Sequence, residues 1–139
     1  MTAIDRRTLL AALLASTALH TTRALAATAG QQKFIDAALA MKRDAEQTGD
    51  QPYGAVIARH EAIVGWAPSR VVVRRDPTAH AEREAIRDAQ RHLGGDLSGC
   101  VMYSTSRPCA ACEAAAAEAN IERMFFGAAA TDAGRPRKG

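Results

Sequence analysis

Four side chains in two short segments combine a metal-binding set with a neighbouring carboxylate. His80 and Glu82 lie in the sequence DPTAHAE, and Cys109 and Cys112 lie in the later sequence PCAAC. One imidazole and two thiolates suit a tetrahedral zinc ion, and three protein ligands leave the fourth position open for water, as in catalytic zinc sites. We therefore predict that His80, Cys109 and Cys112 bind Zn2+, with Glu82 as the catalytic residue beside the metal.

These four residues predict a hydrolytic reaction. Zinc lowers the pKa of a bound water from about 15.7 to about 7, so a zinc-bound hydroxide can act as the nucleophile at neutral pH. Glu82 would take a proton at this site and deliver it to a ring nitrogen and to a departing amine. The order His-x-Glu followed by Pro-Cys-x-x-Cys is a signature of zinc-dependent nucleobase deaminases, which release ammonia from an amidine-like ring carbon.

The sequence around these motifs resembles the cytidine-deaminase-like superfamily, and within it the branch of guanine deaminases and tRNA adenosine deaminases. The resemblance runs from roughly residue 31 to residue 132 and also rests on Pro52–Ile57 and on Ala85-Ile86-Arg87. It implies an α/β fold of three layers, α/β/α, with a mixed sheet of about four strands and helices on both faces. The two helices that carry the zinc ligands would lie side by side.

The resemblance also implies which groups contact the substrate. Backbone groups near Ala81 and Ser106 would contact the ring. Ser69 stands where the family typically has an asparagine that holds the substrate, and a serine cannot form the same pair of hydrogen bonds. Arg107 stands where a glutamate usually precedes the Pro-Cys motif, which reverses the charge at the rim of the site.

The spacing of the ligands supports only part of this site. Cys109 and Cys112 are three residues apart and would share one face of a helix, and the N-terminal end of that helix would favour their thiolate forms. His80 and Glu82 are two residues apart and do not share a face of an ideal helix. That both reach one site is therefore implied by the resemblance alone.

Hydrophobic patterns predict the elements that carry these residues. Helices are expected over residues 31–47 and 78–92, the second ending at Gly94-Gly95, with Leu93 among its inward residues. A hairpin of buried strands is expected at residues 53–58 and 63–67, with His60 in its turn. Two more strands are expected, at residues 100–103, with Cys100 buried, and at residues 124–126. The Cys109 helix lies between them in the sequence, and this strand-helix-strand order favours parallel pairing of the two strands.

Residues 68–77 are predicted to form a loop over the site. Asp76 and Pro77 would serve as the N-cap and first-turn proline of the helix that follows. The run Val71-Val72-Val73 leaves a short strand open as an alternative. Arg74 and Arg75 are expected to be solvated, with contact to a phosphate as the less common alternative.

Residues 1–26 are predicted to be a signal peptide of the twin-arginine type. Arg6 and Arg7 precede an apolar run to Leu19, and Ala24-Leu25-Ala26 offers small residues for cleavage. A frayed N-terminal helix is the alternative; the apolar run is too short for a membrane span. We expect an exported, periplasmic protein with no stable membrane anchor after cleavage, in which residues 27–139 form one zinc-dependent deaminase domain.

The end of the chain bears on the expected pocket. The sequence stops at Gly139, where the family normally continues with elements that close over the base. The domain is therefore expected to be short at its C-terminus, with a more open and wetter pocket.

Charge bears on the partners. The chain has 18 Lys and Arg against 15 Asp and Glu, a net charge of +3, and Arg6, Arg7 and Arg23 against Asp5 place +2 of it in the predicted leader. The rest of the chain carries a net charge of about +1 and has no cluster of basic residues in its sequence. A nucleic-acid partner is therefore not expected. We expect a small-molecule base or nucleoside, with guanine as first candidate and cytosine-type bases after it, and from the resemblance a possible homodimer.

Two other hypotheses stay open. A degenerate deaminase fold would bind zinc without turnover, which the changes at Ser69 and Arg107 allow. An exported thiol-disulfide protein would use the Cys-x-x-Cys motif, but that hypothesis leaves the pattern of His80 and Glu82 unexplained.

Overall fold

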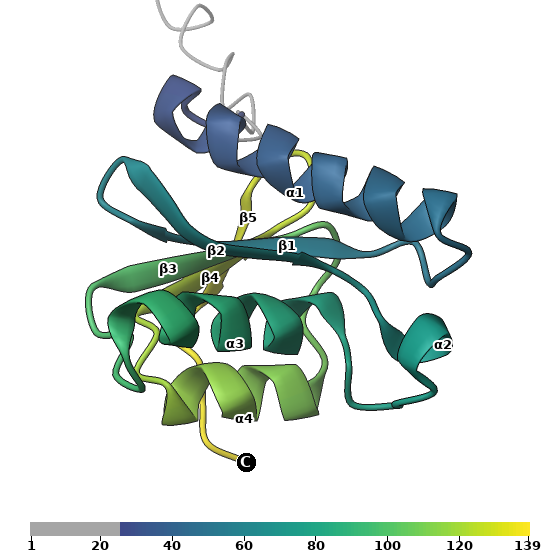
Figure 1. The fold of residues 1–139 in the computed structure, drawn as a ribbon. Coiled ribbons are helices and arrows are strands. Elements are labelled where there is room, and N and C mark those ends of the chain that lie inside the picture. The colour runs from purple at the N-terminus through teal and green to yellow at the C-terminus, as the bar shows by residue number, and fades with distance from the viewer. Residues whose placement is uncertain (1–25) are drawn as a thin grey trace, which may run out of the picture.

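The computed structural model describes residues 26–139, a mixed five-stranded sheet with helices on both faces (Figure 1). The signal-peptide prediction concerns residues that, apart from Ala26, lie outside this part of the chain. Within the described part, no helix combines the length and apolar character that crossing a membrane requires. The elements are α1 (Ala29–Gln47), β1 (Gly54–Arg59), β2 (Ala62–Pro68), α2 (Val71–Arg74), α3 (Ala81–Leu93), β3 (Cys100–Ser104), α4 (Ala110–Glu118), β4 (Arg123–Phe126) and β5 (Thr131–Gly134).

The strand order is β2-β1-β3-β4-β5. β1 pairs antiparallel with both β2 and β3, β3 pairs parallel with β4 through α4, and β5 returns antiparallel to β4. The predicted hairpin, with His60 in its turn, and the predicted parallel pair are confirmed. The expected count of about four strands is one too low, because β5 is a four-residue edge strand with no buried side chain and no apolar alternation to reveal it.

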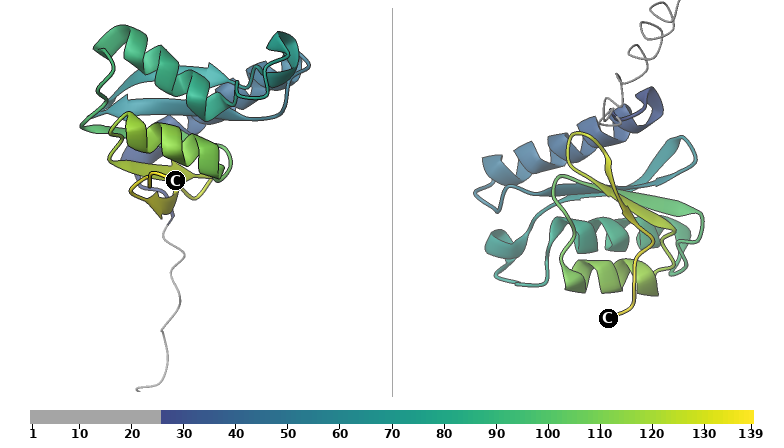
Figure 2. Two further views of the ribbon diagram at one scale, coloured as in Figure 1. Left: turned by 90° about the horizontal axis from the view of Figure 1, so that it is seen from below. Right: turned by 180° about the vertical axis from the view of Figure 1, so that it is seen from behind.

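The two faces of the sheet have different roles: one is covered by a supporting helix, and the other by the helices that carry the predicted site. α1 covers one face of the sheet, while α3 and α4 lie side by side across the other (Figures 1 and 2). Under α1, the ring of Tyr103 stacks between those of Phe34 and Phe125, with both centroid distances 5.1 Å. The predicted α/β/α architecture is confirmed.

A glycine lets α3 lie directly against the sheet. An added Cβ on Gly65 of β2 would stand 2.6 Å from both the carbonyl oxygen of Ala85 and the amide nitrogen of Ala89, a distance that real Cβ atoms do not show. Ala81, Ala85 and Ala89 are themselves fully buried. The small residues on both elements therefore fix how close α3 comes to β2, and with it where the first turn of α3 lies.

The segment between β2 and α3 differs from its prediction. Residues 71–74 form the short helix α2 rather than a loop or a strand. α3 begins at Ala81 with His80 as its N-cap, not at residue 78. Asp76 caps a turn instead, since its carboxylate accepts hydrogen bonds from the backbone N–H and the hydroxyl of Thr78. The C-terminal end at Gly94 is confirmed, but Leu93 is exposed rather than inward.

Candidate active site

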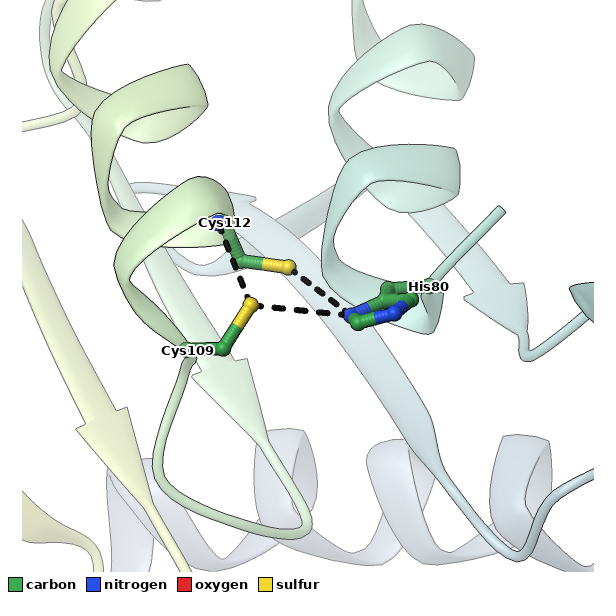
Figure 3. A group of neighbouring side chains, drawn as sticks. All are labelled: His80, Cys109 and Cys112. Atoms are coloured by element: carbon green, nitrogen blue, oxygen red, sulfur yellow. Dashed lines mark hydrogen bonds between the residues drawn. The ribbon is translucent and has the colours of Figure 1, made fainter. Parts of the chain in front are cut away.

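His80, Cys109 and Cys112 meet where the first turns of α3 and α4 lie side by side (Figure 3). The Nδ1 atom of His80 lies 3.4 Å from Cys112 Sγ and 3.6 Å from Cys109 Sγ. The ligand atoms of the three residues all lie within 4.8 Å of one another. The structure therefore brings together the three side chains predicted to bind metal.

The late start of α3 explains how two residues so close in sequence reach one site. His80 has extended backbone, with φ −63° and ψ 148°, as the N-cap of α3. Its side chain therefore does not follow the helical repeat and reaches across to α4, while Glu82 occupies the first turn. Had the helix begun at residue 78, His80 and Glu82 would face different directions.

Local structure at the start of α4 places the two sulfurs. Cys109 is the N-cap of this helix and Cys112 lies in its first turn. The backbone N–H of Cys112 donates a hydrogen bond to the sulfur of Cys109 at 3.4 Å. Cys109 therefore lies at the N-terminal end of α4, which carries partial positive charge.

The ligand spacing fits a tetrahedral zinc ion. Zinc lies about 2.3 Å from thiolate sulfur and about 2.0–2.1 Å from imidazole nitrogen, so tetrahedral S and N ligands are separated by about 3.5–3.6 Å. The two observed N to S distances of 3.4 and 3.6 Å agree with that value. No fourth metal-binding side chain joins this group among residues 26–139, which is the donor set of a catalytic rather than a structural zinc site.

Glu82 lies directly beside the metal ligands. Its side chain is 6% exposed, and its Oε2 atom lies 3.7 Å from Cys112 Sγ. Burial raises the pKa of the Glu82 carboxyl, and the opposing effects of its own backbone N–H, the His80 charge and the Cys112 thiol do not cancel that rise. A carboxyl with a raised pKa next to a metal site is suited to accept and return a proton.

The same environment acts on Cys112. Burial raises the pKa of its thiol, and the nearby Glu82 carboxylate and Cys109 raise it further. Without metal, this buried sulfur therefore keeps its proton. Since only the thiolate binds zinc, metal uptake must displace that proton.

A cavity of about 460 Å3 opens over these residues. Its lining includes Ser69, Ala81 and Ser106, the three residues predicted to contact substrate, together with His80 and Glu82. Ser69, Ala81 and Glu82 are buried, whereas Gln51, Tyr53 and Arg107 of the same lining are exposed. The lining thus combines buried residues beside the metal ligands with exposed polar ones, and the cavity's size is typical of a small-molecule site.

Comparison with known proteins assigns the family. Residues 28–128 match the family model described as the cytidine and deoxycytidylate deaminase zinc-binding region. The chain belongs to this family. The assignment and the cluster of His80, Cys109 and Cys112 together identify Zn2+ as the cofactor.

Individual relatives of this deaminase-family chain differ in their substrates. It is 38% identical over 100 residues to the tRNA-specific adenosine deaminase of Aquifex aeolicus, covering 71% of this chain and 66% of the relative. It is 41% identical over 83 residues to the guanine deaminase of Bacillus subtilis, covering 59% and 53%. A crystal structure of guanine deaminase from Bacillus subtilis superposes with a TM-score of 0.66 at 35% identity, covering 69% of this chain and 62% of that one. The matches thus span about half to two thirds of these relatives.

Asp50 is a residue of this deaminase fold that the sequence did not single out. Its carboxylate accepts hydrogen bonds from the Ser69 hydroxyl at 2.8 Å and from the backbone N–H of Val72 and of Val73, both at 2.9 Å. In the sequence, Asp50 stands only as the last residue of the polar segment Thr48-Gly49-Asp50 that follows α1. The structure shows that it fixes both a buried cavity residue and the start of α2.

The rim of the cavity is organised around Ser106 and Arg107. The backbone carbonyl of Ser106 accepts a hydrogen bond from the Ser104 hydroxyl at 2.7 Å, which fixes this backbone at the cavity wall. The guanidinium of Arg107 lies over the ring of Phe126, with 5.7 Å between Cζ and the ring centroid. The charge reversal noted in the sequence therefore belongs to an exposed residue of the cavity lining.

Proposed function

We propose that this chain is a hydrolytic deaminase of a nucleobase or nucleoside, with guanine as the first candidate. The observation that carries the proposal is the buried Glu82 carboxyl, which lies beside the three zinc ligands and opens into the same cavity as Ser69 and Ala81. In the reaction, water adds to the ring carbon that carries the amino group, and the amine leaves as ammonia.

Bound zinc would act as a Lewis acid and lower the pKa of water at the site. Glu82 would accept one proton from the attacking water on a carboxylate oxygen and pass it to the ring nitrogen. It would then accept the second proton, from the hydroxyl group now on the ring carbon, and deliver it to the amine as the C–N bond breaks, which leaves a carbonyl group and ammonia. Its burial keeps bulk water away from the proton that it carries between donor and acceptor.

The remaining cavity residues would orient the ring. The Ser69 hydroxyl gives its hydrogen to Asp50, so it offers only oxygen lone pairs to a ligand and would accept a hydrogen bond from a ring N–H or amino group. Ala81 is the first residue of α3, where backbone N–H groups have no partner within the helix. That N–H would donate to a ring acceptor, as the resemblance implies.

Ammonia release from a panel of substrates tests the proposal. The panel holds guanine, adenine, cytosine, their nucleosides and a tRNA anticodon stem-loop, each with zinc-loaded protein. Glu82→Gln should lower turnover by at least about 100-fold while retaining one zinc per chain. Glu118→Gln changes an exposed glutamate on α4 and should leave both properties unchanged.

The panel also separates the alternatives. Zinc retention without ammonia from any substrate would favour the degenerate zinc domain. Metal-free protein with an oxidised Cys109–Cys112 pair would favour the thiol-disulfide hypothesis. Turnover of the stem-loop alone would place the chain with the tRNA-specific relatives and overturn the assignment to a small base.

We also propose export to the periplasm, supported only by the pattern of residues 1–26. Replacing Arg6 and Arg7 with lysine should block a twin-arginine route. Fractionation of cells producing each form would show whether the shortened protein still appears in the periplasm. Its unchanged arrival there would exclude the twin-arginine assignment.

A further inference from the structure

Arg107 places a positive charge at the opening of the cavity. Among the described residues that line the cavity, it is the one arginine or lysine. It is exposed, whereas Glu82 and Ser69 in the same lining are buried. A ligand whose ring sits beside Glu82 would therefore share its cavity with a solvent-accessible guanidinium.

Arg107 has no carboxylate in ion-pair contact within the described part of the chain. None of the ion pairs formed among residues 26–139 includes Arg107. Its guanidinium lies over the face of Phe126 instead. A cation–π contact holds the charge in place but leaves the N–H donors in the guanidinium plane available to a partner.

The acidic residue on α4 near Arg107 is already occupied. The Oε1 atom of Glu113 accepts hydrogen bonds from the Arg137 backbone N–H at 3.1 Å and from Arg137 Nε at 3.0 Å. These two contacts are the main reasons for the lowered pKa of Glu113, to which the charge of Arg107 contributes last. Glu113 is therefore engaged by Arg137 and forms no ion pair with Arg107.

We propose that Arg107 binds an oxyanion carried by the substrate, so that among the amino-heterocycles that the site accepts, those with a phosphate or carboxylate group bind more tightly than the matching neutral nucleoside. Guanidinium groups bind both oxyanions through paired N–H donors. The proposal refines the deaminase function and rests on it for the position of the ring. It predicts a ligand that spans the cavity, with its ring at Glu82 and its anion at Arg107.

Equilibrium binding tests this without depending on turnover. Zinc-loaded Glu82→Gln protein would be titrated by calorimetry with guanosine, guanosine 5'-monophosphate and the 5'-carboxylic acid of guanosine, and with the matching cytidine series. At least one anionic form should bind about tenfold more tightly than its neutral nucleoside, a difference of about 1.4 kcal/mol. The two anionic forms distinguish a phosphate from a carboxylate preference.

Variants at position 107 assign the preference to this residue. In the Glu82→Gln background, Arg107→Gln should bring the ratio of the affinities for the anionic and the neutral ligand close to one. Arg107→Lys should keep part of the preference for the anionic ligand, because lysine retains the charge but lacks the planar guanidinium group. Arg43→Gln, which changes an exposed arginine on α1, should keep the full ratio. Equal zinc content and circular dichroism of all variants would establish that they are folded.

Several outcomes would overturn the proposal. These are equal affinity for neutral and anionic ligands, no binding of any of these ligands, a preference that survives in Arg107→Gln, or binding of an RNA stem-loop but not of the monophosphate. Ammonia release measured separately on the protein with Glu82 intact keeps the two proposals apart. An anion preference dependent on Arg107 without any turnover would support the anion site and refute deamination.

Discussion

Ser69 gives its hydroxyl hydrogen to Oδ1 of Asp50, across 2.8 Å, in the buried wall of the cavity. The other carboxylate oxygen of Asp50 accepts the N–H groups of Val72 and Val73 at the start of α2. One buried carboxylate thus sets the hydrogen-bonding character of a cavity residue and anchors the segment that leads into α3. Substrate orientation and local stability should therefore change together when Asp50 is altered.

Replacing Asp50 with asparagine tests this coupling. An amide has one acceptor oxygen and an NH2 group, which cannot accept the hydrogen bonds now made to the second oxygen. We expect a loss of about 1–3 kcal/mol in the free energy of unfolding and a rise in KM larger than any fall in kcat. Urea denaturation and steady-state kinetics measure both. Asp36→Asn, at an exposed position on α1, is the control and should change neither.

The same carboxylate predicts how stability depends on pH. Burial alone would raise the pKa of Asp50, but hydrogen bonds from Val73, Ser69, Gln51 and Val72 together lower it below its ordinary value of 3.8. A native pKa below the unfolded one means that the stabilisation is complete above about pH 3.8 and is lost as the pH falls through the native pKa. The difference in unfolding free energy between wild type and Asp50→Asn should therefore be constant from pH 7 to 5 and shrink below pH 3.8.

That pH series should use metal-free protein, because acid also releases zinc from its thiolate ligands. A difference that stays constant down to pH 2 would show that the Asp50 carboxylate is not specifically stabilised in the native state.

The metal site could be read from the sequence because its chemistry is local. The motif of Cys109 and Cys112 spans four residues, and the helix that follows places both sulfurs whatever the rest of the fold does. The geometry of His80 and Glu82 could not be read in this way. It depends on where α3 begins, and the pair Asp76-Pro77 looks like a helix start although it caps a turn.

The wall of the cavity depends on contacts between distant residues. Three consecutive β-branched valines favour a strand, yet Val71–Arg74 forms a helix whose first N–H groups are held by Asp50. A local pattern gives no sign of an acceptor twenty-two residues earlier. The sequence points to Ser69 only through the family resemblance. That its hydroxyl group donates its hydrogen could be assigned only once the acceptor, Asp50, was located.

Gly65→Ala should show how closely α3 must approach β2. The new methyl group would meet backbone atoms of Ala85 and Ala89 at 2.6 Å, and backbone cannot move aside as a flexible side chain would. We expect a loss of about 1–3 kcal/mol, measured by urea denaturation. Gly95→Ala is the matched control, since a Cβ there meets no atom within 4 Å, and it should lie within about 0.5 kcal/mol of wild type. Equal stability of the two variants would contradict the close packing.

Zinc should join α3 and α4 and stabilise the fold. The ligands lie before the first turn of α3 and at the start of α4, so metal binding fixes the two helix ends relative to each other. A ligand bound only by the native state adds about 2.7 kcal/mol at 100 times its Kd. Thermal unfolding should therefore move to higher temperature with zinc and back with a chelator.

Variants separate this stabilising role from catalysis. His80→Ala should abolish the zinc-dependent rise in Tm because it removes a direct ligand. Glu82→Gln should keep that rise while losing turnover, since Glu82 lies beside the ligand set without belonging to it. If Glu82→Gln also lost the rise, its carboxylate would have to count as a metal ligand. The site would then have no open position for water, and hydrolysis at this centre would no longer follow from its geometry.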